Sequence, residues 1–407
     1  MVEPDNQIRK EASQNAAMPL VSVIIPAYNA ATWIPATLRS VLAQTYHNIE
    51  VLVVDDGSQD ATPEIVQAFA AQDSRVTLLQ QNNSGVAAAR NLAIAQATGE
   101  YIAPIDADDI WYPQNLEKQV RCILQANSSV GLVYAWSLYI DEQDQIIWSY
   151  VNHEFLYTVV GNAYPALLYR NFIDNASAPL IRRSCFAAVG GYDASLRAQN
   201  AQGCEDWDLY LRIAERYDFA VVPEFLIGYR QITHSMSMNT AAMEKSYRLT
   251  MQAARQRCPD TPDWIHRWSR SCFYVYLFGK SCSSGDVVKA SLWGWCAVTM
   301  DSVLLVAPFL YRRFLRCFAN FLLKPLNIRQ RQATSSGWRS RLVSDTRTLA
   351  NVIAEAKLTQ PSQKFYDRLL LHRWESVLDW GASAPAQSTV LDPTFGTGQL
   401  HESHSGN

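Results

Sequence analysis

Four short apolar runs separated by helix-like segments constrain the fold of this chain more than any other feature. They occupy residues 21–25, 51–54, 76–79 and 101–105. Near-continuous aliphatic and β-branched runs are typical of strands buried on both faces of a parallel sheet. The segments between them carry apolar residues at helical spacing, and right-handed crossovers join such units. The pattern predicts an α/β fold with a doubly wound, mostly parallel sheet.

Single residues mark where these elements begin and end. Pro26 is expected to end the first strand, and Asp60 is a suitable N-cap for a helix over 60–72. Gly99 is expected to close the helix that Ser84 and Gly85 open. Pro104 lies inside the fourth run, and proline cannot donate a ladder hydrogen bond. We therefore expect a bulge or a sheet edge at Pro104.

The alternation of strand-like and helix-like segments becomes less regular after Asp109, and from about residue 240 the pattern is mainly helical. We expect further elements as a helix over 113–127, a strand over 130–134, a helix over 206–216, and strands over 219–222 and 225–229. The domain organisation that follows is a flexible tail over 1–18, the α/β domain over 19–240, a mainly α-helical C-terminal region over 241–385 and a disordered tail over 386–407.

The apolar segment 287–310 allows three interpretations. A membrane-spanning helix needs about 20 apolar residues, but Lys289 and Asp301 interrupt this segment and Pro308 lies near its end. A packed helical pair is the second interpretation. The third is an interfacial helix, which the basic and aromatic stretch from Tyr311 to Phe318 favours. Peripheral membrane association therefore stays open.

Charge and cysteine content narrow the class of protein. The formal net charge is −3, whereas nucleic-acid-binding domains are usually strongly basic, so we expect no nucleic-acid partner. None of the eight cysteines forms a CxxC pair, and no apolar leader follows the polar first 17 residues. We therefore expect reduced cysteines in a cytoplasmic protein, with the cytoplasmic face of a membrane as an alternative location.

Polar clusters follow three of the predicted strands, at residues 26–29, 55–58 and 106–109. Doubly wound sheets bind ligands at the carboxyl ends of their strands. Several carboxylates gathered there would repel one another unless a cation neutralised them, and oxygen-rich sites suit Mg²⁺ or Mn²⁺. That cation would also neutralise a diphosphate leaving group.

Four segments, in order, resemble the family 2 glycosyltransferases. They read VSVIIPAYNA, VLVVDDGSQDAT, NSGVAAARNLAIAQATGEYIAPIDADDIWYP and CEDWDLYLR, and the resemblance covers roughly residues 20–240. It implies a Rossmann-like GT-A fold and metal-dependent, inverting transfer from a nucleotide-diphosphate sugar.

The resemblance implies a donor site at the first two strand ends and the following helix. Tyr28 matches a tyrosine that stacks on the nucleotide base, and Asp56, with Asp55 beside it, matches an aspartate that binds base and ribose. Arg90 matches an arginine near the nucleotide. As alternatives, Tyr28 could be an aromatic residue of the core, Asp56 could serve only to form a turn, and Arg90 could lie on the surface of its helix. The expected donor-binding residues are Pro26, Tyr28, Asn29, Asp55, Asp56, Arg90, Asp106 and Arg230.

The segment IDADD resembles the family's DxD motif. Asp108 would ligate the divalent metal, and Asp106 would reach the metal or the ribose. His234 is a candidate third ligand or diphosphate contact, with a structural histidine as the alternative. Arg230 has two open roles, a phosphate clamp or a surface ion pair.

An acceptor hydroxyl is a poor nucleophile at neutral pH, so a positioned carboxylate should take its proton. The family's acidic pair at a helix start matches Glu205 and Asp206. We assign the base to Asp206, which the helical spacing places away from the apolar face. Glu205 would orient it or contact the acceptor. The alternative is a helix N-terminal charge favoured by the dipole.

The resemblance as a whole predicts transfer from a donor, with UDP favoured, to a saccharide or lipid-linked acceptor in cell-surface polysaccharide synthesis. The alternative is a non-catalytic nucleotide-sugar-binding subunit of an assembly complex. A dinucleotide-dependent oxidoreductase would need GxGxxG where PAYNA stands. The donor sugar, the linkage and the oligomeric state are left open.

Overall fold

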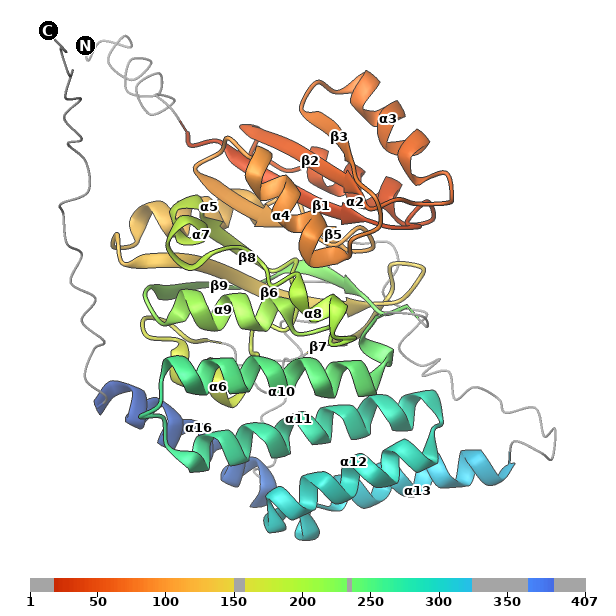
Figure 1. Ribbon diagram of the computed structural model, residues 1–407, viewed down its shortest axis with the longest axis vertical. Helices are drawn as coiled ribbons and strands as arrows, with labels where there is room; N and C mark the ends of the chain where they lie inside the picture. The colour runs from red at the N-terminus through yellow and green to blue at the C-terminus, as the bar shows by residue number, and fades with distance from the viewer. Residues whose placement is uncertain (1–17, 150–157, 233–235, 324–364, 384–407) are drawn as a thin grey trace, which may run out of the picture.

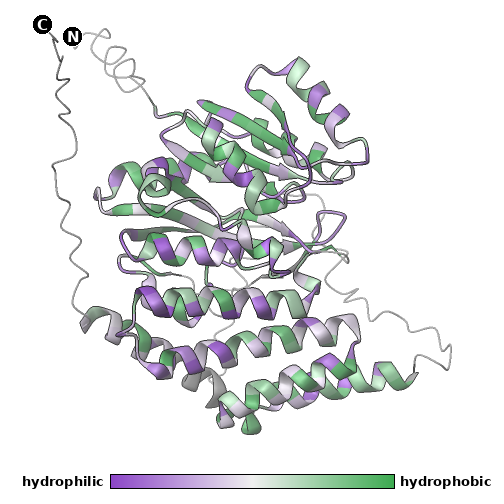
Figure 2. Ribbon diagram, viewed as in Figure 1, coloured by the Kyte–Doolittle hydropathy of each residue, from purple (hydrophilic) through white to green (hydrophobic). Residues whose placement is uncertain are grey.

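The computed structural model describes residues 18–149, 158–232, 236–323 and 365–383. The expected tails, apart from Met18, and His234 lie outside these residues. An α/β layer built from the N-terminal half of the chain rests on a stack of helices from the C-terminal half (Figure 1). Figure 2 shows the hydrophobic residues concentrated in the strands of the sheet.

The first four strands form the predicted parallel sheet, in the order β3-β2-β1-β4. Every residue of β1 is buried, as a strand covered by helices on both faces requires. The elements are β1 (Val21–Ala27), α2 (Ile34–Leu42), β2 (Ile49–Asp55), α3 (Thr62–Gln72), β3 (Val76–Gln80), α4 (Val86–Gln96) and β4 (Tyr101–Pro104).

The rest of the nine-stranded sheet is mixed. From β4 the order continues β8-β6-β9-β5, with β7 paired to β6. Only β6 and β9 run parallel here; β8, β5 and β7 pair antiparallel with their neighbours. These strands are β5 (Ile110–Trp111), β6 (Val130–Ile140), β7 (Ile146–Ser149), β8 (Pro179–Arg182) and β9 (Asp218–Arg230). The predicted α/β class is confirmed, with parallel pairing concentrated in the N-terminal half.

Two proline expectations need correction. Pro26 does not end the first strand, because β1 continues to Ala27. Pro104 lies in an interior strand, not at an edge or a bulge; β8 pairs with β4 only at Tyr101 and Ile102, so the missing N–H of Pro104 breaks no ladder bond on that side.

Two further boundaries differ from the sequence expectation. The strands expected over 219–222 and 225–229 form the single strand β9, and the extra residues Pro223 and Glu224 fall where its register against β6 shifts. Helix α4 ends at Gln96, before Gly99. Gly99 instead allows close packing, since a Cβ there would lie 2.7 Å from the Ser22 nitrogen.

The remaining helices and 3₁₀ turns follow β5 along the chain, and α10 to α13 and α16 lie below the sheet in Figure 1. They are α5 (Asn115–Gln125), α6 (Tyr164–Tyr169), α7 (Arg183–Val189), α8 (Ser195–Ala198), α9 (Glu205–Ala214), α10 (Thr240–Arg257), α11 (Asp263–Ser284), α12 (Val287–Met300), α13 (Pro308–Leu323) and α16 (Phe365–Ser383), with the 3₁₀ turns η2 (Met236–Met238) and η3 (Ser302–Val306). Trp207 of α9 packs on Tyr247 of α10 and Phe273 of α11, whose rings stack 4.1 Å apart. The C-terminal helices therefore support the helix that carries Asp206.

The segment 287–310 is split at Asp301. Helix α12 packs on α11, and the buried Asp301 carboxylate begins η3 and binds Arg373 of α16 through both of its oxygens. In the part of the chain that the structure describes, no helix has the length and apolar character needed to cross a membrane.

Candidate functional site

The loops after β1 and β2 are tied together at one edge of the sheet. Tyr28 is 49% exposed there, so it is not the core aromatic considered as its alternative. Asn29, in the left-handed region at φ 49°, accepts a hydrogen bond from the Gln59 N–H and donates its own N–H to the Ser58 hydroxyl. Pro26 is buried within β1. An exposed aromatic ring thus projects from a rigid edge.

Asp55 and Asp56 are both buried. The Asp56 carboxylate accepts hydrogen bonds from the backbone N–H groups of Ser84 (2.7 Å) and Gly85 (2.8 Å), and also from the Gln81 side chain. Gly85 has φ 92°, which favours glycine, and directly precedes α4. Asp56 therefore holds the turn that aims α4 at the site, while its contact with a nucleotide stays a prediction.

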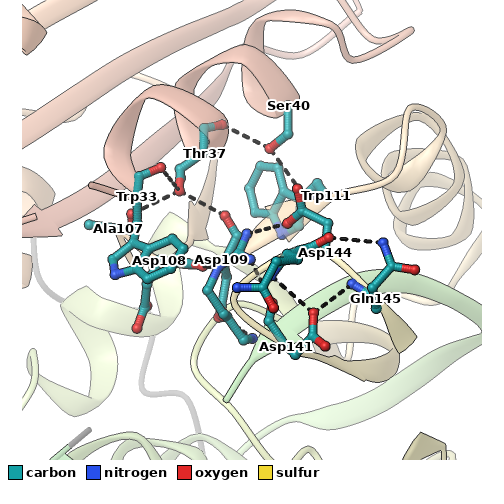
Figure 3. Close-up of polar contacts among 12 residues, drawn as sticks. Trp33, Thr37, Ser40, Ala107, Asp108, Asp109, Trp111, Asp141, Asp144 and Gln145 are labelled. Carbon is teal, nitrogen blue, oxygen red and sulfur yellow. Dashed lines mark hydrogen bonds and ion pairs between the residues drawn. The ribbon is translucent and has the colours of Figure 1, made fainter. Parts of the chain in front are cut away.

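Helix α2 holds the turn that contains Asp106, Asp108 and Asp109 (Figure 3). The Thr37 hydroxyl lies 2.8 Å from the backbone oxygens of Ala107 and Asp109, and the Ser40 hydroxyl accepts the Trp111 N–H. These hydrogen bonds hold the turn against α2.

The three carboxylates of this turn have different environments. Asp109 is fully buried and accepts hydrogen bonds from the Ser177 hydroxyl and the Arg230 N–H. Burial, together with Asp108 and Asp106, raises the pKa of Asp109 well above its usual range. Asp106 and Asp108 are partly exposed. Burial, and after it the charge of Asp106, raises the pKa of Asp108 to about 6.

Arg90 connects this turn with α9. It is 4% exposed, so the alternative of a helix-surface arginine is wrong. Its guanidinium forms an ion pair with Asp106 and lies 5.0 Å from the ring centre of Tyr192. Its positive charge also lowers the pKa of Asp206, against the larger effect of burial.

Asp206 lies in the first turn of α9, where its carboxylate accepts the Trp207 N–H at 2.8 Å. The side chain is partly exposed, whereas Trp207 beside it is buried. Burial raises the pKa of Asp206 to about 7, with Arg90 opposing the shift. Glu205 is buried and accepts the Gly203 N–H, and burial raises its pKa as well. Asp206 is therefore a carboxylate able to exchange a proton near neutral pH.

Arg230 is buried, so it is not a surface ion pair. Its three nitrogens donate to the Asp108 carbonyl oxygen, the Asp141 carbonyl oxygen and the Asp144 carboxylate, and its guanidinium lies 4.8 Å from the ring centre of Trp33. These contacts make Arg230 a cross-link that holds the Asp108 turn against β9.

Several residues of the site have no signal in the sequence. Ser177 bonds Asp109 and the Asp106 N–H from an irregular segment, Tyr192 lies under Arg90, and Arg197 approaches Asp56 at 3.9 Å. Each comes from a region without periodic pattern. Trp33, whose ring contacts Arg230, differs from these residues because it lies close in the sequence to the predicted polar cluster at residues 26–29.

The residues present fit a divalent cation that is shared with a phosphate ligand. Within the described ranges, no group of three His, Cys, Asp or Glu side chains is arranged to hold a metal ion. Mg²⁺, however, is commonly held by one or two carboxylates plus substrate phosphates. Asp108 is partly exposed, and no described side chain bonds its carboxylate, while the crowding at the turn favours an added cation.

Comparisons with known proteins agree with this geometry. A family model described as Glycosyl transferase family 2 matches residues 22–178. An uncharacterized glycosyltransferase of Rickettsia typhi is 30% identical over 228 residues, which are 56% of this chain and 69% of that protein. One of Rickettsia conorii is 32% identical over 198 residues, 48% of this chain.

The match covers only 28–30% of the length of the first three rickettsial relatives. Among solved structures, S. aureus TarS residues 1–349 superposes with a TM-score of 0.50 at 16% identity, covering 74% of this chain and 88% of that one. At this identity the likeness shows the fold alone.

Proposed function

Because this chain belongs to glycosyl transferase family 2, we propose that it transfers a sugar from a nucleoside-diphosphate donor to an acceptor hydroxyl, with inversion at the anomeric carbon. The observation that carries the proposal is the arrangement around Arg90. This buried cation binds Asp106 of the DxD turn and acts on Asp206, a carboxylate with a pKa of about 7.

The proposed reaction is a single displacement in which Asp206 is the general base. Asp206 takes the proton of the acceptor hydroxyl as its oxygen attacks the anomeric carbon. The bond from that carbon to the diphosphate oxygen breaks, and the nucleoside diphosphate leaves with the bonding electrons. A base is most effective when its pKa lies near the working pH, which the burial of Asp206 provides.

The donor side is assigned to the edge formed by the β1 and β2 loops. Tyr28 offers an exposed ring to the base, Asp55 and Asp56 lie at the end of β2, and Pro26 and Asn29 shape the edge. When bound, Mn²⁺ or Mg²⁺ would neutralise charge on the diphosphate.

On the metal side of the site, Asp108 is the proposed protein ligand and Asp106 the second, held by Arg90. Arg230 supports the Asp108 turn, and its role as a phosphate contact stays a prediction. A role for His234 stays a prediction.

The family resemblance further suggests UDP as the nucleotide, and a saccharide or lipid-linked acceptor in cell-surface polysaccharide synthesis, at the cytoplasmic side of the membrane. The alternative is a non-catalytic nucleotide-sugar-binding subunit. The raised pKa of Asp206 favours the enzyme, because a subunit that only binds the donor gains nothing from a carboxylate that exchanges a proton near neutral pH.

Thermal shift with nucleotides tests the donor site. UDP at 100 times its dissociation constant should stabilise the protein by about 2.7 kcal/mol, a rise in Tm of roughly 3–4 °C for a chain of this length, when Mn²⁺ is present. With EDTA the shift should shrink. The donor-site proposal fails if neither UDP, GDP nor dTDP raises the Tm with metal present. If a nucleotide does bind, release of nucleoside diphosphate from a UDP-sugar would distinguish an enzyme from a subunit that only binds the donor.

The pH dependence of transfer follows from Asp206. The reactive form is the carboxylate, and burial raises its pKa to about 7. We therefore expect kcat/KM to be level above about pH 7 and to fall about tenfold per pH unit below it. An acid limb centred near pH 4, the range of an ordinary aspartate, would contradict the assignment.

A further inference from the structure

Helix α12 exposes an apolar stripe on the face opposite to its packing. Val288, Leu292 and Trp295 follow at intervals of four and three residues and are 80%, 51% and 69% exposed. Ala290 and Ala297, on the inner face, are fully buried. Residues at these intervals share one side of a helix, so the stripe is a continuous surface that contributes nothing to the core.

Helix α13, which contacts α12, repeats the pattern. Its stripe consists of Tyr311, Leu315, Phe318 and Leu322, at intervals of four, three and four residues, each between 41% and 62% exposed. The turn η3 between the two helices adds Leu305 and Val306, at 55% and 64%. Exposed apolar residues gathered in this way are unusual on a soluble surface and indicate an interaction site.

The charges on these helices have one sign. Lys289, Arg312, Arg313 and Arg316 are exposed, whereas the one acidic residue of segment 287–323, Asp301, is buried against Arg373. Lys289 pairs with Asp286 and Arg313 bonds the Gly279 carbonyl oxygen, but Arg312 and Arg316 have no ion-pair partner among the described residues. Being four residues apart, these two arginines form a basic row beside the apolar stripe of α13.

We propose that this surface, the apolar stripes of α12 and α13 with the row Arg312–Arg316, docks on a lipid bilayer that contains anionic phospholipid. Aliphatic and aromatic side chains would enter the interface while the arginines meet the headgroups, as in interfacial amphipathic helices. A two-fold pairing of two copies would bring like charges together, which disfavours self-association. The surface lies at the end of the molecule opposite to β3 (Figure 1).

Vesicle co-sedimentation of the full chain tests the proposal without donor or acceptor, so its failure is separate from a failure of the proposed transfer reaction. We expect binding to vesicles of phosphatidylcholine mixed with phosphatidylglycerol, and much weaker binding to phosphatidylcholine alone. Added salt should weaken the binding.

Two double variants divide the apolar and the basic contributions. Arg312→Gln with Arg316→Gln should weaken binding roughly 25-fold, since each basic residue near an anionic surface contributes about fivefold. Leu315→Gln with Phe318→Gln should abolish binding. Leu124→Gln on α5, at a site 52% exposed, and Arg183→Gln, at an exposed site, are matched controls that should bind like the parent.

Three results would overturn the proposal. The first is no binding, or equal binding to both kinds of vesicle. The second is binding that both double variants retain. The third is a concentration-dependent dimer in analytical ultracentrifugation that Leu315→Gln with Phe318→Gln dissociates, because the surface would then bind a second copy.

Discussion

Replacement of Asp206 by Asn is expected to lower kcat by about 10²–10⁴-fold while UDP binding persists, because the amide cannot accept the acceptor proton. The substitution keeps the shape of the side chain and the oxygen that accepts the Trp207 N–H. The fold of α9 should therefore survive. Single-turnover transfer measures the rate, and the Mn²⁺-dependent thermal shift by UDP measures the donor site.

Asp208→Asn is the matched control for this prediction. Asp208 is two residues along the same helix, but it pairs with Arg212 and Arg257 instead of facing the site. Its loss should lower the Tm and leave kcat within about threefold of the parent, because it takes no part in proton transfer. If Asp206→Asn retained parental turnover, Asp206 could not be the base.

The parallel core could be predicted from the sequence because its signals are local. The runs that became β1 and β2 are apolar almost throughout, which is typical of strands covered on both faces. The mixed half was harder to predict. Strand β8 is four residues long, and β9 contains Pro223, so neither offers an uninterrupted pattern. Their partners are fixed by tertiary contacts between distant segments.

The site residues show the same difference between local signals and tertiary contacts. The acidic turn at residues 106–109 could be found from its place after a strand and its match to the family's DxD motif, and Asp206 from its match to the family's acidic pair at a helix start. The burial of Arg90 could not be found in this way, because an Ala-rich helix has no clear outer face. The cross-link made by Arg230 could not be found either, because its partners Asp141 and Asp144 lie on a loop that is distant from it in the sequence.

Arg90 also compensates the charge of two carboxylates at this site, those of Asp106 and Asp206. One guanidinium, buried against Tyr192, bonds Asp106 and lowers the pKa of Asp206 from the still higher value that burial alone would give. Asp109 is stabilised separately, by Ser177 and the Arg230 N–H. Asp108 is the carboxylate of this turn for which the described side chains provide no hydrogen-bond partner, so it is the one free to bind a cation.

Asp108→Asn is therefore expected to lower transfer at least 100-fold and to remove the Mn²⁺-dependent part of the UDP thermal shift, because a metal contributes several kcal/mol to stabilising the leaving diphosphate. Asp109→Asn, one residue away, is the sharp control. That carboxylate is buried and saturated by Ser177 and Arg230, so its loss should lower the Tm while the remaining folded protein keeps its Mn²⁺-dependent shift. Isothermal titration of Mn²⁺ into each UDP-saturated variant measures the difference directly. Equal Mn²⁺ affinity in the parent and in Asp108→Asn would show that the cation is held elsewhere.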